Sequence, residues 1–595
     1  MLSLRRLPAR PPASRCRRPA VLVAAAAAAL AILAEGGSSD GAAVSGPRAT
    51  AAQAQGGRLT VLAGGDVDSV DPGITYYTFG NTVANATQRT LLGSPPAAGS
   101  ASVPDLAEAT PEVSPDGLTV TVRIKRGIRF SPPVNREVTS RDVKYAIERG
   151  FFRTVANPYA TQYFGDLAGA QAAAPPGSTI TGLETPDDQT LVLRLTRPRG
   201  GFVAAALVMS LTAPVPPEYA AAFDAVSPST YGRHQVATGP YMIQNDALGN
   251  TIGYRPGKAI HLVRNPNWDP ATDYRPARLD EVEIREGNAD TATAARRILR
   301  GSGMINGDFA PPAAVLRRDA GRYRDQFTFT AEGGVNFAPL NTRLAPFTNL
   351  NVRRAVVAGF DRAGTLRAAG GRLAGTLAAH FIPPGVPGFD EAGGFSGSAS
   401  KLYARAHGDR RLAAFYFRRA GFRSGRYEGR RPLNVLVSSD TAGRSIGGSV
   451  RRSLERLGFR VRVRAVSFDR MLSTCSRPSS RIHMCPFFGW YRDFPDAETV
   501  IDPLFNGANI RPHGNNNVAQ LNIAPINQAI EAAKALIDPQ ARAQAWAAID
   551  RQLVDLAPGV ALFYPRIAAI RSRNVTGQVN RLLGGSWDLS FMSVG

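Results

Sequence analysis

The sequence predicts an α/β protein built of more than one separately packed lobe. The chain has 595 residues, which is beyond the size at which a single hydrophobic core keeps growing. Its apolar fraction of 44% is ordinary for a soluble globular protein. Strand-like and helix-like segments also alternate through its last third. These observations exclude a disordered chain and a protein with many membrane spans.

The net charge of +23 is carried almost entirely by arginine. The chain contains only five lysines, and its arginines are spread along the whole length. No recognised nucleic-acid-binding module or groove of basic and aromatic residues accompanies them. We therefore expect no nucleic-acid partner. A basic protein that associates with an anionic cell envelope is kept as an alternative.

Residues 1–54 are predicted to form a signal peptide and a tether. Arginines between Arg5 and Arg18 precede the apolar run Ala20–Ala34, which is too short to cross a bilayer comfortably. A small-residue, polar stretch follows from Gly36 to Gly57. We expect the chain to be exported, with Ala52-Gln53-Ala54 as one candidate cleavage site.

The first half of the chain shows clear strand, turn and cap signals. Leu118–Ile124 alternates apolar and polar residues with period two, as a half-buried strand does. Thr139 or Ser140 is a candidate N-cap for the helix that follows. A hairpin is expected between Thr238 and Trp268. The predicted strands are 58–62, 118–124, 190–195 and 279–284, and the predicted helices are 81–92, 142–150 and 200–209.

The second half begins with an extended segment, 327–341, and continues as α/β structure. Gly421 and Gly458 each follow a helical pattern and end it. The predicted helices are 351–362, 411–420, 445–457, 525–536 and 539–556, and the predicted strands are 433–437, 459–464 and 560–565.

Several stretches carry a resemblance to one family. They are Lys125-Arg-Gly-Ile-Arg-Phe130 with Thr139-Ser-Arg-Asp-Val143, Thr238-Gly-Pro-Tyr241 with Arg264-Asn-Pro-Asn-Trp268, Asn351 to Arg362, and Gly489-Trp-Tyr-Arg-Asp493. Together they resemble the family 5 extracytoplasmic solute-binding proteins of ABC importers, the class that binds peptides, dipeptides and oligopeptides. The linker Ser131–Glu137 departs from the short turn that is usual in that family.

The resemblance implies a two-lobed, periplasmic-binding-protein-like fold of type II with an enlarged lobe one, an interlobe ligand cleft and a hinge. Residues 58–330 would form the first part of lobe one with its extra subdomain, 331–560 lobe two, and 561–595 the return to lobe one. Many family members carry a lipid-modified cysteine after the signal. Here Gly36 stands at that place, so we expect a secreted or envelope-associated protein without that anchor.

The resemblance also implies where a ligand binds. In the family's peptide binders, the acid three residues after the tryptophan meets the ligand's α-ammonium group, and Asp493 has that position. Trp490 and Tyr491 would be cleft walls, with Tyr76 and Tyr77 on the other side. The alternatives are packing for these aromatic residues and a surface pair with Arg492 for Asp493. Gly333 and Gly334 fit a hinge, and these two glycines and Asn336 are also among the residues that we expect to contact the ligand.

The predicted function is capture of peptides or similar small solutes and their delivery to the permease of an ABC transporter. We expect a monomer without enzymatic activity, cofactor or metal. One alternative is a non-peptide solute, such as a metal chelate or a sugar, because a fold does not fix a function. A second is a secreted serine hydrolase, because Gly443-Arg-Ser445-Ile-Gly447 matches a nucleophile-elbow pattern. For Ser445 we favour a helix N-cap.

Cys475 and Cys485 are the two cysteines outside the signal segment. In an oxidising compartment, a pair ten residues apart indicates a disulfide that closes a short loop. A metal site formed by Cys475, His483 and Cys485 is the alternative, but it lacks a fourth ligand and any known spacing.

Overall fold

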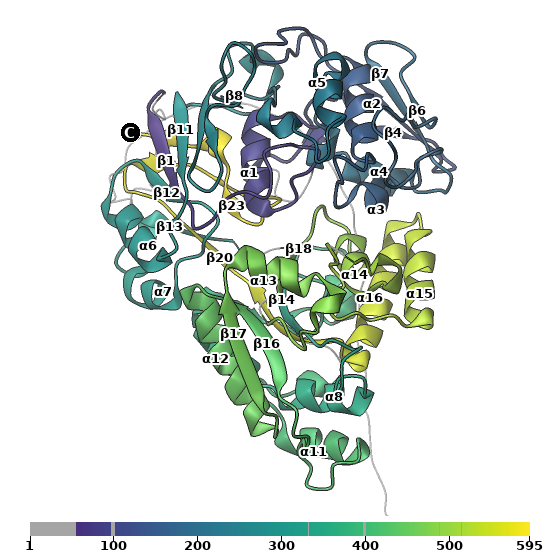
Figure 1. Cartoon of the computed structure of the whole chain (residues 1–595), viewed down its shortest axis with the longest axis vertical. Coiled ribbons are helices and arrows are strands. Elements are labelled where there is room, and N and C mark those ends of the chain that lie inside the picture. The colour runs from purple at the N-terminus through teal and green to yellow at the C-terminus, as the bar shows by residue number, and fades with distance from the viewer. Residues whose placement is uncertain (1–54, 97–101, 331–332, 397–399, 487, 513) are drawn as a thin grey trace, which may run out of the picture. The chain divides into compact units, whose positions relative to one another are not determined.

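The computed structural model describes residues 55–96, 102–330, 333–396, 400–486, 488–512 and 514–595 (Figure 1). The predicted signal peptide and tether, residues 1–54, lie outside the described residues. Within these ranges, no helix is both long enough and apolar enough to cross a membrane.

The buried apolar side chains separate into clusters that define two lobes. The largest cluster is built from residues between Val335 and Tyr564, and we call its elements lobe two. The other clusters are built from residues up to Phe327 and from Ala568 onward, with Phe494 as the one exception, and we call their elements lobe one. The chain therefore leaves lobe one, forms lobe two and returns.

Lobe one contains a six-stranded mixed sheet. Its central strand β1 pairs in parallel with β11 and β12, whereas β10 is antiparallel to its neighbours. The strands are β12 (Met304–Asn306), β1 (Arg58–Leu62), β11 (Glu281–Arg285), β10 (Ala259–Arg264), β8 (Tyr241–Ile243) and, on β10, β9 (Tyr254–Arg255). Trp587 and Met592 from the end of the chain are buried in the same cluster.

A second, antiparallel sheet of four strands forms a separate part of lobe one. It is composed of β4 (Glu112–Val113), β5 (Thr119–Arg123), β7 (Thr190–Arg194) and β6 (Leu183–Glu184). The helices of lobe one are α1 (Thr78–Thr87), α2 (Ser140–Arg149), α3 (Ala160–Phe164), α4 (Gly200–Ala206), α5 (Pro217–Asp224), α6 (Thr291–Arg300) and α7 (Ala313–Asp319).

Lobe two is organised around an antiparallel sheet of four strands, with helices packed on it. The sheet order is β15 (Gly375–Leu377), β19 (Gly559–Pro565), β14 (Gly334–Pro339) and β18 (Phe488–Tyr491). A parallel pair, β16 (Leu433–Ser438) and β17 (Val461–Val466), lies beside it. The helices are α8 (Leu350–Gly359), α9 (Arg362–Ala369), α10 (Phe389–Ala392), α11 (Arg410–Arg419), α12 (Thr441–Arg456), α13 (Phe468–Cys475), α14 (Glu498–Phe505), α15 (Ala524–Lys534) and α16 (Pro539–Leu556).

Two pairs of strands carry the chain between the lobes. In lobe one, β13 (Phe327–Thr330) pairs with β20 (Ile567–Ile570), and in lobe two β14 pairs with β19. Figure 1 shows β13 and β20 entering the group of elements around β14. The outgoing and returning strands are thus hydrogen-bonded neighbours on both sides of the crossing.

The predicted elements agree with the observed ones in most places. Strand β1 and helix α16 have the predicted bounds, and Thr139 rather than Ser140 is the N-cap of α2, where its N–H donates to Asp142 Oδ2 at 2.7 Å. Helix α1 begins three residues before the predicted start and ends at Thr87. Helix α12 begins at Thr441, four residues before the predicted start, because Asp440 caps it.

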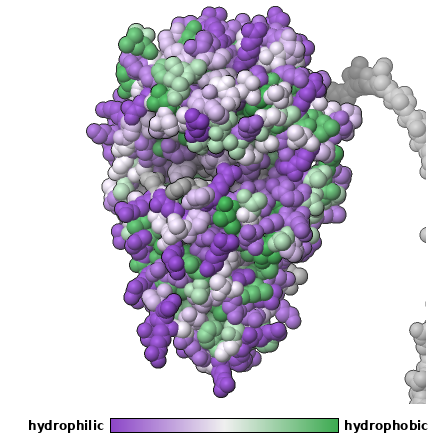
Figure 2. Space-filling view, turned by 45° about the vertical axis from the view of Figure 1, so that its right-hand side comes forward, coloured by the Kyte–Doolittle hydropathy of each residue, from purple (hydrophilic) through white to green (hydrophobic). Residues whose placement is uncertain are grey.

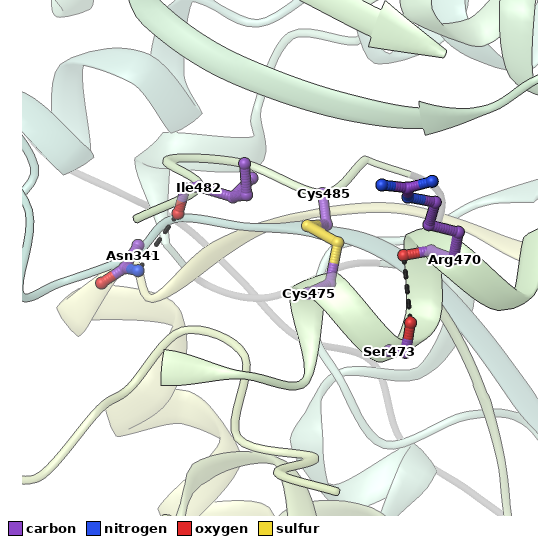
Figure 3. Close-up of a disulfide and its surroundings, with 6 residues drawn as sticks. All are labelled: Asn341, Arg470, Ser473, Cys475, Ile482 and Cys485. Carbon is purple, nitrogen blue, oxygen red and sulfur yellow. Dashed lines mark hydrogen bonds between the residues drawn. A yellow bond between two sulfur atoms is a disulfide. The ribbon is translucent and has the colours of Figure 1, made fainter. Parts of the chain in front are cut away.

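The cysteines lie on two neighbouring segments of lobe two. Cys475 ends α13 and Cys485 precedes β18, with their Cα atoms 6.4 Å apart and their sulfur atoms at bonding distance (Figure 3). Both side chains are buried in the lobe-two cluster. The two thiolates that a metal site would need are therefore directed at each other. Among the described residues, no group of three His, Cys, Asp or Glu side chains is placed to hold a metal ion.

Candidate functional site

The segment that carries the predicted ligand residues is an edge strand and the turn after it. Strand β18 pairs with β14 on one side only, with Val335 opposite Trp490 and Gly334 opposite Tyr491. Trp490 is 8% exposed, and its indole N–H donates to the carbonyl oxygen of Thr499 at 2.8 Å. This bond fixes the turn that presents Asp493, because Thr499 lies in the helix that follows.

Asp493 lies at the contact between the lobes. Its Oδ2 accepts a hydrogen bond from the hydroxyl of Tyr76 at 2.8 Å and another from the hydroxyl of Tyr163, and both tyrosines belong to lobe one. The Tyr76 ring also meets the edge of Trp490, with ring centroids 6.2 Å apart. The structure thus brings together three residues that the sequence predicted for the cleft: Tyr76, Trp490 and Asp493.

The surroundings of Asp493 favour its neutral form. Burial raises the pKa of Asp493 to about 7, although the hydroxyls of Tyr163 and Tyr76 act in the opposite direction. A carboxyl group whose pKa is raised by burial is stabilised in its charged form when a cation binds beside it.

Sequence reasoning missed the second tyrosine and the aromatic residues behind it. Tyr163 lies on α3, one turn after Tyr159, and the two ring centroids are 5.8 Å apart. Phe494 of lobe two is fully buried among the aromatic residues of lobe one, 5.4 Å from Tyr163 and 5.2 Å from Phe202 between centroids. The spacing of Tyr159 and Tyr163 places them on one helix face, but only the fold shows that this face meets Asp493.

The glycines predicted for the hinge lie directly against the end of β18. Gly333 has φ of +77°, and a side chain there would come within 3.1 Å of Arg492 Nε. A Cβ on Gly334 would lie 2.5 Å from the Tyr491 ring. Asn336 is buried opposite Gly489 in the ladder. These three residues shape the backbone beside the site.

Tyr77 has a different place from Tyr76. It is the N-cap residue of α1, its side chain is 36% exposed, and its N–H donates to Asp68 Oδ2 at 3.1 Å. The same carboxylate oxygen accepts the N–H of Tyr76 at 2.6 Å. Asp68 therefore fixes the backbone that directs Tyr76 toward Asp493.

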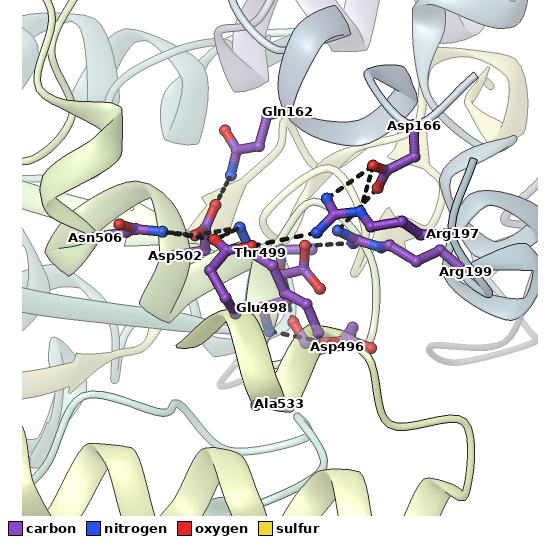
Figure 4. A network of polar contacts seen from close by, with 12 residues as sticks. Gln162, Asp166, Arg197, Arg199, Asp496, Glu498, Thr499, Asp502, Asn506 and Ala533 are labelled. Atoms are coloured by element: carbon purple, nitrogen blue, oxygen red, sulfur yellow. Dashed lines mark hydrogen bonds and ion pairs between the residues drawn. The ribbon is translucent and has the colours of Figure 1, made fainter. Parts of the chain in front are cut away.

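A polar network joins the lobes next to this site (Figure 4). Arg199 of lobe one reaches Glu498 of lobe two at 2.5 Å, and both side chains are almost completely buried. Gln162 donates to Asp502 Oδ2 at 3.2 Å. Arg197 approaches Glu531 at 3.5 Å, but these two side chains are about half exposed. The lobes are therefore held together by buried as well as exposed polar contacts.

The surface around these contacts is mostly hydrophilic. Figure 2 shows polar residues over most of one face, with hydrophobic residues scattered among them and a shaded hollow about halfway along it.

Ser445 does not have the position that either sequence interpretation gave it. It lies in the second turn of α12, and the whole Gly443–Gly447 motif is helical, so the sharp strand-to-helix turn of a nucleophile elbow is not formed. The N-cap of α12 is Asp440, whose side chain accepts the N–H of Gly443 at 2.8 Å. The N-cap prediction for Ser445 was wrong because the helix extends one turn further back.

Two α/β lobes joined by paired strands, with residues that the sequence predicted for a ligand site at their contact, are the arrangement expected of a solute-binding protein. The chain belongs to the bacterial extracellular solute-binding proteins of family 5, whose middle-region model matches residues 101–512.

The relatives agree with this assignment. The chain is 24% identical over 490 residues to heme-binding protein A of Haemophilus influenzae, covering 81% of this chain and 82% of the relative. It is 24% identical over 551 residues to di/tripeptide-binding protein 2 of Pseudomonas aeruginosa, covering 89% and 93%. Among solved structures, clavulanic acid biosynthesis oligopeptide binding protein 2 superposes with a TM-score of 0.76 at 27% identity, covering 91% and 96%.

Proposed function

We propose that the protein captures peptides with a free α-amino group outside the cytoplasmic membrane. The observation that carries this proposal is Asp493, a half-buried carboxyl group between the lobes that accepts hydrogen bonds from Tyr76 and Tyr163. Among the residues that the structure describes, no ion pair joins Asp493 to a basic side chain, and an α-ammonium group beside it would supply a cation. The names of the relatives, which include di/tripeptide- and oligopeptide-binding proteins, support a peptide as the ligand.

The free edge of β18 supplies a second reason to favour peptides. It is the last strand of the lobe-two sheet, and Gly489 within it is exposed. A peptide that adds to such an edge is held by main-chain hydrogen bonds, which do not depend on its side chains. Trp490 and Tyr491 would then be walls of the cleft. This arrangement accounts for broad specificity.

The test is calorimetry of the mature protein with a small library of peptides, on wild type and on Asp493→Asn. We expect the variant to bind at least tenfold more weakly, because a buried charge-assisted hydrogen bond contributes about 1.5 to 3 kcal/mol. Acetylation of the peptide's α-amine should weaken binding to wild type and leave the variant unaffected. Equal affinity of the two proteins for unmodified peptides would refute the role of Asp493.

For the whole molecule, we propose closure of the two lobes about a hinge at Gly333 and Gly334. The lobes expected from the sequence are 58–330 with 561–595 and 331–560, and the cluster of lobe two reaches Tyr564, so β19 stays with lobe two. Ligand contacts to both lobes favour the closed form only by their differential affinity for it. The exported monomer would then deliver its solute to the permease of an ABC transporter. We further propose that the N-terminal signal is cleaved and that Cys475 and Cys485 form a disulfide after export.

A non-peptide solute is the second candidate, because heme-binding protein A is among the relatives. Native mass spectrometry of the purified protein distinguishes the two. Co-purified peptides would support the first proposal, whereas a carried non-peptide mass, together with no calorimetric response to peptides, would support the second.

A further inference from the structure

A pocket of about 630 Å³ lies where lobe one meets lobe two at helices α7, α9 and α12. This volume is in the range of small-molecule sites. Helix α7 belongs to lobe one, since Val315 and Leu316 pack in a cluster with Leu62 of β1. Helix α12 belongs to lobe two through Val450 and Leu454. Figure 1 shows α7 beside the end of α12. None of the residues predicted to bind the transported solute lines this pocket.

The charged lining of the pocket is almost entirely positive. Its only acid is Asp361, and its basic residues are Arg317, Arg367, Arg444, Arg452 and Arg456. The carboxylate of Asp361 is already occupied: it accepts the N–H of Gly364 at 2.7 Å and contacts His407 Nδ1 at 3.1 Å and Arg456 at 3.4 Å. One shared carboxylate therefore leaves most of the positive charge of the pocket uncompensated.

Three of the arginines have exposed side chains and no acidic partner. Across the described part of the chain, no ion pair joins Arg317, Arg367 or Arg452 to a carboxylate. Arg444 donates from Nε to the carbonyl oxygen of Ser439 at 2.7 Å, which is an uncharged partner. A guanidinium group presents a planar set of donors that matches carboxylate and phosphate oxygens.

Hydroxyl groups complete the donor set. Ser445 and Ser449 line the pocket from consecutive turns of α12, and Ser445 is exposed to it. The hydroxyl of Ser449 lies 3.2 Å from that of Thr365. Serine hydroxyls donate to the same oxygens as arginine does. The motif around Ser445, which is not a nucleophile elbow, thus has a place in this pocket.

We propose that this pocket binds a small, multiply charged oxyanion, such as a phosphate ester or a polycarboxylate, that bridges the two lobes. Arg317 approaches from lobe one and Arg367 and Arg452 from lobe two. Like charges from the two lobes repel one another, and an anion between them replaces that repulsion with attraction to both sides. The ligand thereby favours the arrangement in which α7 and α12 are close. The site makes no use of Asp493 and is independent of the identity of the transported solute.

The experiment is calorimetry of the mature protein with pyrophosphate and, separately, with citrate, at low ionic strength. We expect saturable binding of at least one of them, with affinity lowered about tenfold or more in Arg452→Gln and in Arg367→Gln, since each substitution removes a charge-assisted contact. Ser445→Ala should weaken binding by a smaller factor. A preference for pyrophosphate indicates a phosphoryl ligand, and a preference for citrate indicates a polycarboxylate.

Arg451→Gln is the matched control. Arg451 is the chain neighbour of Arg452 on α12 and is similarly exposed, but it pairs with Glu455 at 2.7 Å and does not line the pocket. It removes the same charge from the same helix, and we expect it to leave binding within about twofold of wild type. Equal losses in Arg451→Gln and Arg452→Gln would show that only the net charge attracts the anion, and absence of binding to both anions would also overturn the proposal.

Discussion

At the residue scale, the protonation of Asp493 connects the structure to a measurable property. The group has a pKa of about 7 because burial disfavours its charged form. A ligand ammonium group requires the carboxylate, so binding below that pH must first expel a proton. Peptide binding is thus weakened at acid pH, where Asp493 is protonated, and is strongest at alkaline pH, where Asp493 is charged.

Peptide affinity should therefore fall as the pH is lowered through about 7, by about tenfold for each further unit. Calorimetry between pH 5.5 and 8 measures this slope directly. Tyr163→Phe removes a hydrogen bond to the carboxylate and should move the midpoint of the curve to higher pH, whereas Asp493→Asn should remove the dependence. A wild-type curve without any slope over this range would contradict the assignment.

A second residue-scale prediction concerns a buried ion-pair network in lobe one. Arg149 is completely buried and pairs with Asp71 at 2.7 Å and with Asp224 at 2.6 Å. Arg149→Met leaves two buried carboxylates without a cation and should lower the free energy of unfolding by about 3 to 5 kcal/mol. Arg153→Met, at an exposed position after the same helix, should change it little. Urea denaturation compares the two, and equal midpoints would show that the network is not stabilising.

At the element scale, the cysteine pair connects α13 to the strand that carries the site. The loop it closes spans ten positions of sequence separation and ends directly before β18. Closing a loop of this length stabilises the folded state by about 3 kcal/mol in the chain-entropy model.

Replacing both cysteines by serine should therefore lower the melting temperature and the free energy of unfolding by about 3 kcal/mol. Reductant should destabilise wild type in the same direction and leave the double variant unchanged. Mass spectrometry with and without reductant verifies the bond first. A wild-type protein that carries the bond but is no more stable than the double variant would contradict the expected contribution.

The elements that the sequence predicted well are those with local signals. Helix α16 has Asp538 as its cap and Pro539 in its first turn, and β1 is a run of strand-forming residues. Helix α1 was predicted to begin too late. Asp68, about ten residues before the helix, holds the N–H groups of Tyr76 and Tyr77, the two residues that precede it, and the helix has no side-chain cap of its own. Hydrogen bonds from that distance leave no pattern in the sequence at the start of the helix.

The candidate site could be predicted only in part for the same reason. Asp493 and Trp490 lie in one segment, Gly489 to Asp493, whose resemblance to the family can be recognised in the sequence. Tyr163 is separated from Asp493 by 330 positions, and its role depends on how α3 meets the turn after β18. The pocket between α7, α9 and α12 likewise collects residues from three helices of two lobes. The spacing of these residues along the chain does not predict it.

At the scale of the whole molecule, polar side chains join the two lobes where they meet. Arg199 and Glu498 are both almost completely buried where they meet. Glu498 also pairs with Arg542 of its own lobe at 2.7 Å, and Arg542 keeps Asp496 as a further partner. Removing the charge of Glu498 therefore leaves Arg199 with Asp166 of its own lobe, at 3.4 Å, and removes the buried charge pair that joins the lobes.

Glu498→Gln should accordingly shift the population toward an open form, because the lobes lose their buried charge pair while Arg199 keeps Asp166 within its own lobe. Small-angle X-ray scattering measures the result as an increase in the radius of gyration. Glu531→Gln is the control, since its pair with Arg197 is about half exposed and contributes little. The same radius for both variants would show that the buried pair does not hold the lobes together.

The paired crossing strands also determine how many ways the two lobes can move. Because β13 pairs with β20 in lobe one and β14 pairs with β19 in lobe two, the outgoing and returning segments stay side by side on both sides of the junction, and a motion that shifts one of them along the other would break those ladders. Bending about an axis across the two strands breaks none of them. The proposed closure would therefore be a bending at this junction, and each closure would bring Tyr76 and Tyr163 back to Asp493.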